Sequence, residues 1–131
     1  MDTATRELVR HRAGNRCEYC GATEGLRARI RFHIEHIEHI VARQHGGGDA
    51  PENLALACHL CNAHKGPNLS GIDPTTGRVT PLFHPRRERW AEHFTRIGGQ
   101  IVGHTETGRA TVAVLDMNHP ARMEARLRSE P

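Results

Sequence analysis

Two C-x-x-C pairs have the spacing that most clearly indicates metal binding in this chain. The pairs are Cys17/Cys20 and Cys58/Cys61; they contain every cysteine of the 131 residues, and thirty-seven residues separate them. Each short turn lets two thiolates converge on one ion, and two such pairs complete a tetrahedral site. No signal-like apolar run follows Met1, which indicates a cytoplasmic protein and favours zinc over disulfides. We therefore expect one structural zinc ion.

A second set of reactive side chains lies between and beside these pairs. It consists of Glu38-His39, Asn53, Asn62 and Lys65. Hydrolysis of a phosphodiester needs a nucleophilic water, stabilisation of extra negative charge and help for the leaving oxygen. Histidine is the natural base at neutral pH, and carboxylate and amide oxygens suit a hard divalent cation. The set predicts metal-dependent phosphodiester hydrolysis.

The order of these residues resembles that of the HNH endonuclease family, whose core is the ββα-metal, or His-Me, finger. The matching pieces are Glu38-His39-Ile40-Val41, a Gly-rich loop, Asn53-Leu54 and Cys58-x-x-Cys61-Asn62-x-x-Lys65-Gly66. The resemblance covers about residues 6–67, and the tail is similar to a bacterial subgroup with a C-terminal extension. It implies an α+β fold, with a zinc-stapled nuclease core over 1–67 and a small α/β extension over 68–131.

The resemblance also implies a role for each core residue. His39 would be the general base that activates water, and Glu38 would bind a catalytic Mg²⁺ or Mn²⁺ ion. Asn62 matches a position that is histidine in the founding pattern, and would be the second ligand of that cation. Asn53 matches the middle asparagine, which we expect to order the loop behind the base.

Two basic side chains are candidates for contact with the nucleic acid. Lys65 is the sole lysine and stands where the family often has one, and Arg43 lies near the base. We expect both to contact phosphate. The net charge of +3, with seventeen of eighteen basic residues arginine, is weak evidence by itself because a basic patch requires clustering.

A local repeat leaves the position of the reactive dyad open. Glu35-His36 and Glu38-His39 are both Glu-His pairs three residues apart, so on a regular strand their histidines face opposite sides. Counting from His39 gives seven residues to Gly46 and fourteen to Asn53, the spacing expected of the family. We favour Glu38-His39 and interpret the repeat as a three-residue duplication.

The fullest prediction is a metal-dependent HNH endonuclease that cuts DNA. The alternative is a catalytically silent zinc-containing module that binds nucleic acid, since the same cysteines and arginines would serve it. No base-reading element separates DNA from RNA, and sequence specificity, nicking against double-strand cleavage, and oligomeric state are left open. No membrane partner is expected.

Local patterns predict the elements that position these residues. In the core we expect a helix over 3–13 with Thr3 or Thr5 as N-cap and Gly14 as its end, a knuckle over 17–21, strands over 30–41 and 54–57, and a helix over 58–65. In the extension we expect a strand over 78–83, a helix over 85–96, a hairpin of 100–103 with 110–115, and a helix over 120–128.

Overall fold

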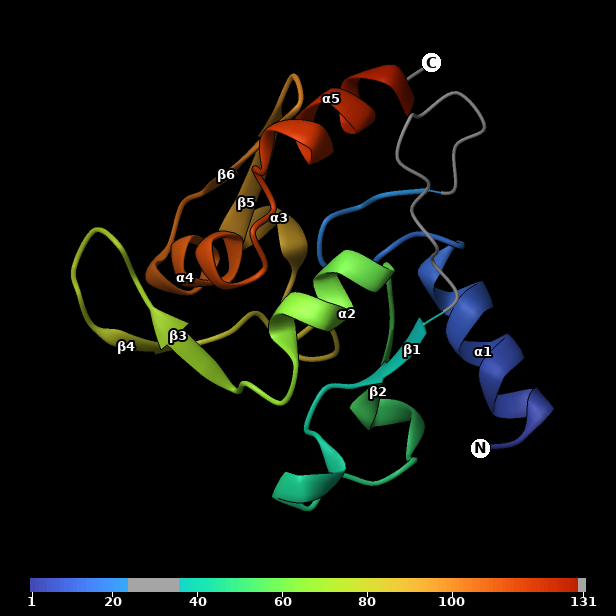
Figure 1. The fold of residues 1–131 in the computed structure, drawn as a ribbon. Helices are drawn as coiled ribbons and strands as arrows, with labels where there is room; N and C mark the ends of the chain where they lie inside the picture. The colour runs from blue at the N-terminus through green and yellow to red at the C-terminus, as the bar shows by residue number, and fades with distance from the viewer. Residues whose placement is uncertain (24–35, 130–131) are drawn as a thin grey trace.

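The computed structural model describes residues 1–23 and 36–129. Over these ranges the chain forms helices and three separate antiparallel strand pairs, which confirms the expected α+β fold (Figure 1). The first part of the strand expected over 30–41, with Glu35, lies outside the described residues. None of the described helices is long and apolar enough to cross a membrane.

Helix α1 (Thr3–Ala13) has the expected bounds, but its cap lies one residue before the first candidate threonine. Asp2 is the N-cap, and its carboxylate accepts a hydrogen bond from the Thr5 amide at 2.8 Å, so the prediction of a threonine cap was wrong. Gly14 ends the helix as expected, at φ 63°, a left-handed conformation that glycine adopts without strain. The helix packs on the core through the fully buried Val9.

The core of the chain is a strand pair followed by a helix. Strand β1 (His36–His39) pairs antiparallel with β2 (Leu54–Ala57), so that His39 lies opposite Leu54. All four β2 residues are buried, whereas β1 is exposed at His36. Helix α2 (His59–Lys65) follows at once, with Cys58 as its N-cap. The connection between the strands carries two short 3-10 helices, η1 (Arg43–His45) and η2 (Pro51–Asn53).

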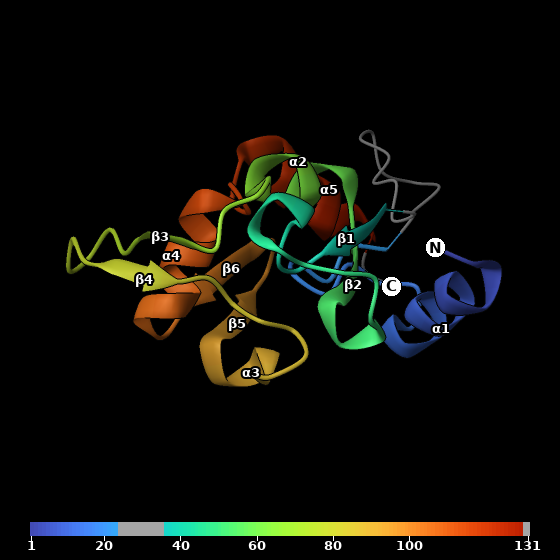
Figure 2. The same ribbon diagram turned by 90° about the horizontal axis from the view of Figure 1, so that it is seen from below.

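The extension is built from two hairpins and three helices. Its elements are β3 (Ser70–Ile72), β4 (Val79–Pro81), α3 (Trp90–His93), β5 (Phe94–Ile97), β6 (Gln100–Gly103), α4 (Glu106–Val114) and α5 (Pro120–Ser129). β3 pairs with β4, and β5 with β6. In Figure 2 the β3–β4 hairpin and α1 lie at opposite ends of the molecule, with β1, β2 and α2 between them.

Two predictions for the extension were wrong. Only Trp90–His93 (α3) of the helix expected over 85–96 is helical. Phe94–Ile97 instead forms a hairpin with Gln100–Gly103 across the two-residue Gly98-Gly99 turn. The segment expected to pair with 100–103 lies instead in α4. Its N-cap is Thr105, whose hydroxyl accepts a hydrogen bond from the Gly108 amide at 2.9 Å. This cap favours a helix although β-branched residues, which prefer strands, follow it.

Core and extension share one hydrophobic cluster. It joins the four cysteines and Ala55 of the core to Phe83, Phe94 and Met117 of the extension. Trp90 packs against Phe94 with ring centroids 5.1 Å apart, and its indole N–H donates to the Tyr19 carbonyl at 2.7 Å. The predicted boundary between residues 67 and 68 therefore crosses a continuous interior; it stays a prediction.

Candidate active site and metal centre

The four cysteine sulfurs meet at one buried point. All of their Sγ atoms lie within 4.8 Å of one another, and the Sγ atoms of Cys20 and Cys58 are 3.8 Å apart. Sulfurs at the corners of a tetrahedron with Zn–S bonds of about 2.3 Å would be about 3.8 Å apart. The thiol set and its spacing therefore fit a structural zinc ion with no open position.

Main-chain amides prepare both cysteine pairs for a metal. The Cys20 amide donates to the Cys17 sulfur at 3.5 Å, and the Cys61 amide to the Cys58 sulfur at 3.4 Å. Such donors favour the thiolate form that a metal requires. The second contact is also the N-cap of α2, so the helix that carries Asn62 begins on a metal ligand.

An open pocket of about 480 Å³ brings together the residues singled out for catalysis. Its wall combines the end of β1, the η1 turn and one face of α2. The lining residues are Glu38, His39, Ala42, Arg43, Gln44, Asn62, Ala63, Gly66 and Pro67. The proposed base, both proposed cation ligands and one proposed phosphate contact thus border the same space.

The imidazole of His39 is held by a carboxylate from the Gly-rich loop. Its Nε2 atom lies 2.7 Å from Oδ1 of Asp49, and the same oxygen accepts from Nη2 of Arg43 at 2.8 Å. The hydrogen bond with His39 is the main reason that the pKa of Asp49 is lowered. Desolvation acts in the opposite direction. Asp49 is therefore an anion at neutral pH, and it fixes which ring nitrogen of His39 faces the loop.

Glu38 points inward from β1 and forms a buried ion pair. Only 5% of Glu38 and 2% of Lys65 are exposed, and Lys65 Nζ lies 2.5 Å from Glu38 Oε1. Burial raises the pKa of Glu38, and the charge of Lys65 partly offsets that effect. Burial also raises the pKa of Tyr19, with the neighbouring Glu38 as the second cause.

Lys65 does not lie where a direct phosphate contact would place it. Its ammonium donates to the Ile40 carbonyl at 3.0 Å and pairs with Glu38, so both of these partners are internal. A direct contact between Lys65 and phosphate stays a prediction, and it would require the ammonium to leave Glu38. Arg43, by contrast, is 68% exposed at the mouth of the pocket.

Asn53 orders the loop behind His39 by three hydrogen bonds. Its Oδ1 accepts from the Val41 amide at 2.8 Å, and its Nδ2 donates to the carbonyls of Val41 at 3.0 Å and Gly48 at 2.9 Å. These bonds hold the two ends of the loop together, and Gly47 packs against the main chain of Val41. The geometry agrees with an ordering role for Asn53.

Asn62 reaches the pocket from the first half of α2. It is half-buried and follows the fully buried Cys61, so neighbouring residues of one helix serve the metal centre and the pocket. Cys61 points to the other sulfurs, whereas Asn62 borders the space beside His39. The two sites are adjacent but share no side chain.

Comparison with known families identifies the segment that contains both sites. Residues 17–68 match the model of the HNH endonuclease family. These residues form an HNH endonuclease domain. The match includes both cysteine pairs and the whole pocket wall described above, and it confirms the resemblance found from the sequence. Neither the search of curated proteins nor the search of solved structures found a match.

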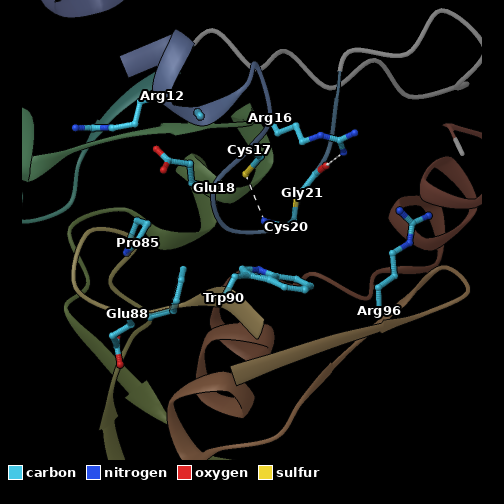
Figure 3. Close-up of a pocket in the computed structure, with 12 residues that line it drawn as sticks. Arg12, Arg16, Cys17, Glu18, Cys20, Gly21, Pro85, Glu88, Trp90 and Arg96 are labelled. Atoms are coloured by element: carbon cyan, nitrogen blue, oxygen red, sulfur yellow. Dashed lines mark hydrogen bonds between the residues drawn. The ribbon is translucent and has the colours of Figure 1, made fainter. Parts of the chain in front are cut away.

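A second pocket, of about 410 Å³, lies where the HNH domain meets the extension (Figure 3). Trp90 forms part of its wall, and Arg12, Arg16 and Arg96 border it. Their guanidinium groups donate to the main-chain carbonyls of Leu54, Gly21 and Gly98. The contact of Arg12 joins α1 to β2, whereas these contacts of Arg16 and Arg96 are local.

Sequence reasoning missed two charged residues that contact the sites of the HNH domain. Asp49 was one of two acids in the Gly-rich loop, and its position between His39 and Asn53 was the available signal. Arg122 of α5 donates to the sulfur of Cys61 at 3.0 Å from the far end of the chain. Nothing in the local sequence distinguishes it from the neighbouring arginines.

Proposed function

We propose that this protein is a metal-dependent endonuclease that hydrolyses phosphodiester bonds in DNA. The observation that carries the proposal is the pocket in which His39, Glu38 and Asn62 meet, inside the HNH domain. A protein that only bound nucleic acid would not need a base and two oxygen ligands around one open space. Each residue has a separate task.

His39 is the general base. Its Nε2 is engaged by Asp49, so the other ring nitrogen, Nδ1, takes the proton from water. Asp49 is a positioning residue that keeps the ring in one orientation and stabilises the positive charge that proton transfer creates. His36, the rival base, is exposed and does not border the pocket, which supports the Glu38-His39 dyad.

Glu38 and Asn62 supply oxygen ligands for the catalytic cation. Neither carboxylate oxygen of Glu38 has a well-oriented hydrogen bond among the described residues, although both are buried and Lys65 lies close. The Glu38 carboxylate has few hydrogen-bond donors and lies at the same open pocket as the Asn62 amide. This pair of oxygen ligands fits Mg²⁺ or Mn²⁺, which accept few protein ligands. When bound, the cation would stabilise negative charge on the phosphate and the leaving oxygen.

The two basic residues near the pocket, Arg43 and Lys65, have different proposed roles. Arg43 is exposed beside Asp49 and is the proposed contact to a phosphate of the bound strand. Lys65 is assigned a positioning role, because it holds the carboxylate of Glu38 and offsets part of its charge. DNA is the proposed substrate; the phosphodiester chemistry itself is common to DNA and RNA.

The test is incubation of the zinc-loaded protein with supercoiled plasmid, with Mg²⁺, Mn²⁺ or a mild chelator. We expect nicked or linear product with either cation and none in the chelator, while elemental analysis still finds one zinc per chain. Cleavage undiminished by excess chelator would refute the cation mechanism. Bound but uncut plasmid under every cation would assign the protein as a silent nucleic-acid-binding module, and cleavage of RNA alone would reassign the substrate.

A further inference from the structure

A buried arginine from the C-terminal helix touches the metal centre. Arg122, on α5, is 2% exposed, and its Nη2 donates to the sulfurs of Cys61 at 3.0 Å and of Cys58 at 3.8 Å. These cysteines precede it by sixty-one and sixty-four residues. The other terminal nitrogen, Nη1, donates to the carbonyls of Leu115 at 2.6 Å and Asp116 at 3.0 Å.

In the part of the chain that the structure describes, no carboxylate balances the charge of Arg122. Among residues 1–23 and 36–129, no ion pair to Asp or Glu includes this guanidinium. An isolated charge in the interior is costly unless it is paired. The guanidinium contacts the sulfurs of Cys58 and Cys61, and four thiolates around Zn²⁺ would leave a net charge of about −2. Guanidinium and metal centre therefore each supply the charge that the other needs.

A second buried arginine, Arg126, helps to hold α5 in the position from which Arg122 contacts the sulfurs. Arg126, one turn further along α5, is 6% exposed and donates to the carbonyls of Met117 and Gly99. Asn118, just before the helix, exchanges two hydrogen bonds of 2.8 Å with the main chain of Ile101. The inner face of α5 is thus attached to the extension by neutral partners and to the HNH domain by Arg122.

We propose that Arg122 is an internal counter-ion of the four-cysteine metal centre, and that it links retention of zinc to docking of the C-terminal helix. Hydrogen-bond donors to the ligands of a metal commonly change its affinity by about 10–100-fold. The linkage is reciprocal: if docked α5 stabilises bound zinc, bound zinc stabilises docked α5 by the same factor.

The first test measures the transfer of zinc from the full-length protein to a colorimetric chelator. Arg122→Gln removes the charge and keeps an amide donor, and should release zinc about 10–100-fold faster than wild type. Arg122→Lys, which keeps the charge, should be intermediate. The matched control is Arg128→Gln on the same helix, because Arg128 is exposed and pairs only with Glu124 among the described residues; it should match wild type. Release from Arg122→Gln at the wild-type rate would overturn the proposal.

The second test needs no variant and therefore does not depend on whether Arg122→Gln folds. Limited trypsin digestion of wild type is followed by mass spectrometry while zinc is withdrawn. We expect cleavage after Arg122 and Arg126 to rise with zinc loss and to precede cleavage after Arg10 in α1. Cleavage after the exposed Arg128 should be the same throughout. Continued protection of Arg122 in the zinc-free protein, or simultaneous cleavage in α1 and α5, would contradict the linkage. Neither readout depends on nuclease activity.

Discussion

At the residue scale, the buried pair of Glu38 and Lys65 has the largest predicted effect on stability. Replacing Lys65 by Met leaves a carboxylate buried beside Tyr19 without a counter-charge. Breaking such a pair from one side typically costs about 3–5 kcal/mol, so the free energy of unfolding of Lys65→Met should fall by that order. Urea denaturation at neutral pH measures it.

A double variant separates the ion pair from simple packing. Glu38→Gln/Lys65→Met removes both charges and should recover most of the loss, since the cost comes from the unpaired carboxylate rather than from the lysine chain. Arg43→Met, at an exposed cation of the same pocket, should change the unfolding free energy little. A Lys65→Met variant as stable as wild type would refute the importance of the pair.

The hydrogen bond between Asp49 and His39 gives a second prediction. Asp49→Asn keeps the size of the side chain but removes its negative charge, so the imidazole is less well held and its protonated form less stabilised. Plasmid cleavage in Mg²⁺ should slow by about tenfold or more, while DNA binding measured by gel shift stays unchanged. Glu52→Gln, an exposed acid of the same loop, is the control; equal slowing in both variants would argue against a specific role for Asp49.

The reactive residues were more predictable than their partners. His39, Asn53 and Asn62 stand at spacings that the HNH pattern fixes, and the structure brings His39 and Asn62 to one pocket with Asn53 behind it. The partner of Lys65 was not predictable, because spacing does not show whether a helical lysine points to solvent or under the neighbouring strand. Arg122 was beyond sequence reasoning for the same reason: its contacts cross more than sixty residues.

At the element scale, the loop between β1 and β2 depends on one close approach of the main chain. A Cβ atom at Gly47 would lie 1.7 Å from the Val41 carbonyl oxygen and 2.8 Å from Nδ2 of Asn53, whereas one at Gly48 would meet nothing within 4 Å. Gly47→Ala should therefore displace the loop that carries Asp49, lower the free energy of unfolding by about 1–3 kcal/mol and slow cleavage. Denaturation and plasmid assays on both variants measure this.

Gly48→Ala is the matched control for this loop. It adds the same methyl group one residue away and should behave as wild type in both measurements. Equal behaviour of the two variants would mean that the loop tolerates a shift of Val41 and does not position the site.

The elements of the core were more predictable than those of the extension. The β2 range and the start of α2 were expected because the cysteine pairs and Asn53 frame them. In the extension, residues 110–115 were expected to form a strand, yet tertiary packing placed most of them in α4, where Gly108 lets the helix approach the His93 carbonyl. The Gly98-Gly99 turn carried a hairpin signal that the expected helix over 85–96 overlooked.

At the scale of the whole molecule, the shared interior predicts that zinc supports both halves of the chain. Cys58→Ser should lose zinc and release α5, and the rest of the extension should then unfold together with the HNH domain in one transition, because metal binding is part of the folding free energy. Trp90 fluorescence reports the extension, and hydrogen exchange of α1 amides reports the core. Asn62→Ala should keep its zinc and its stability. Separate transitions for the two probes would instead support independent domains on either side of residue 67.

The central claim is that His39 acts as the base of a cation-dependent nuclease. Its most direct measurement is the initial rate of supercoiled-plasmid nicking in Mg²⁺ for His39→Ala beside His36→Ala, each with zinc content and DNA binding verified. We predict a loss of about 10²–10⁴-fold for His39→Ala and a wild-type rate for His36→Ala. Normal nicking by His39→Ala, or loss of activity in His36→Ala alone, would contradict it.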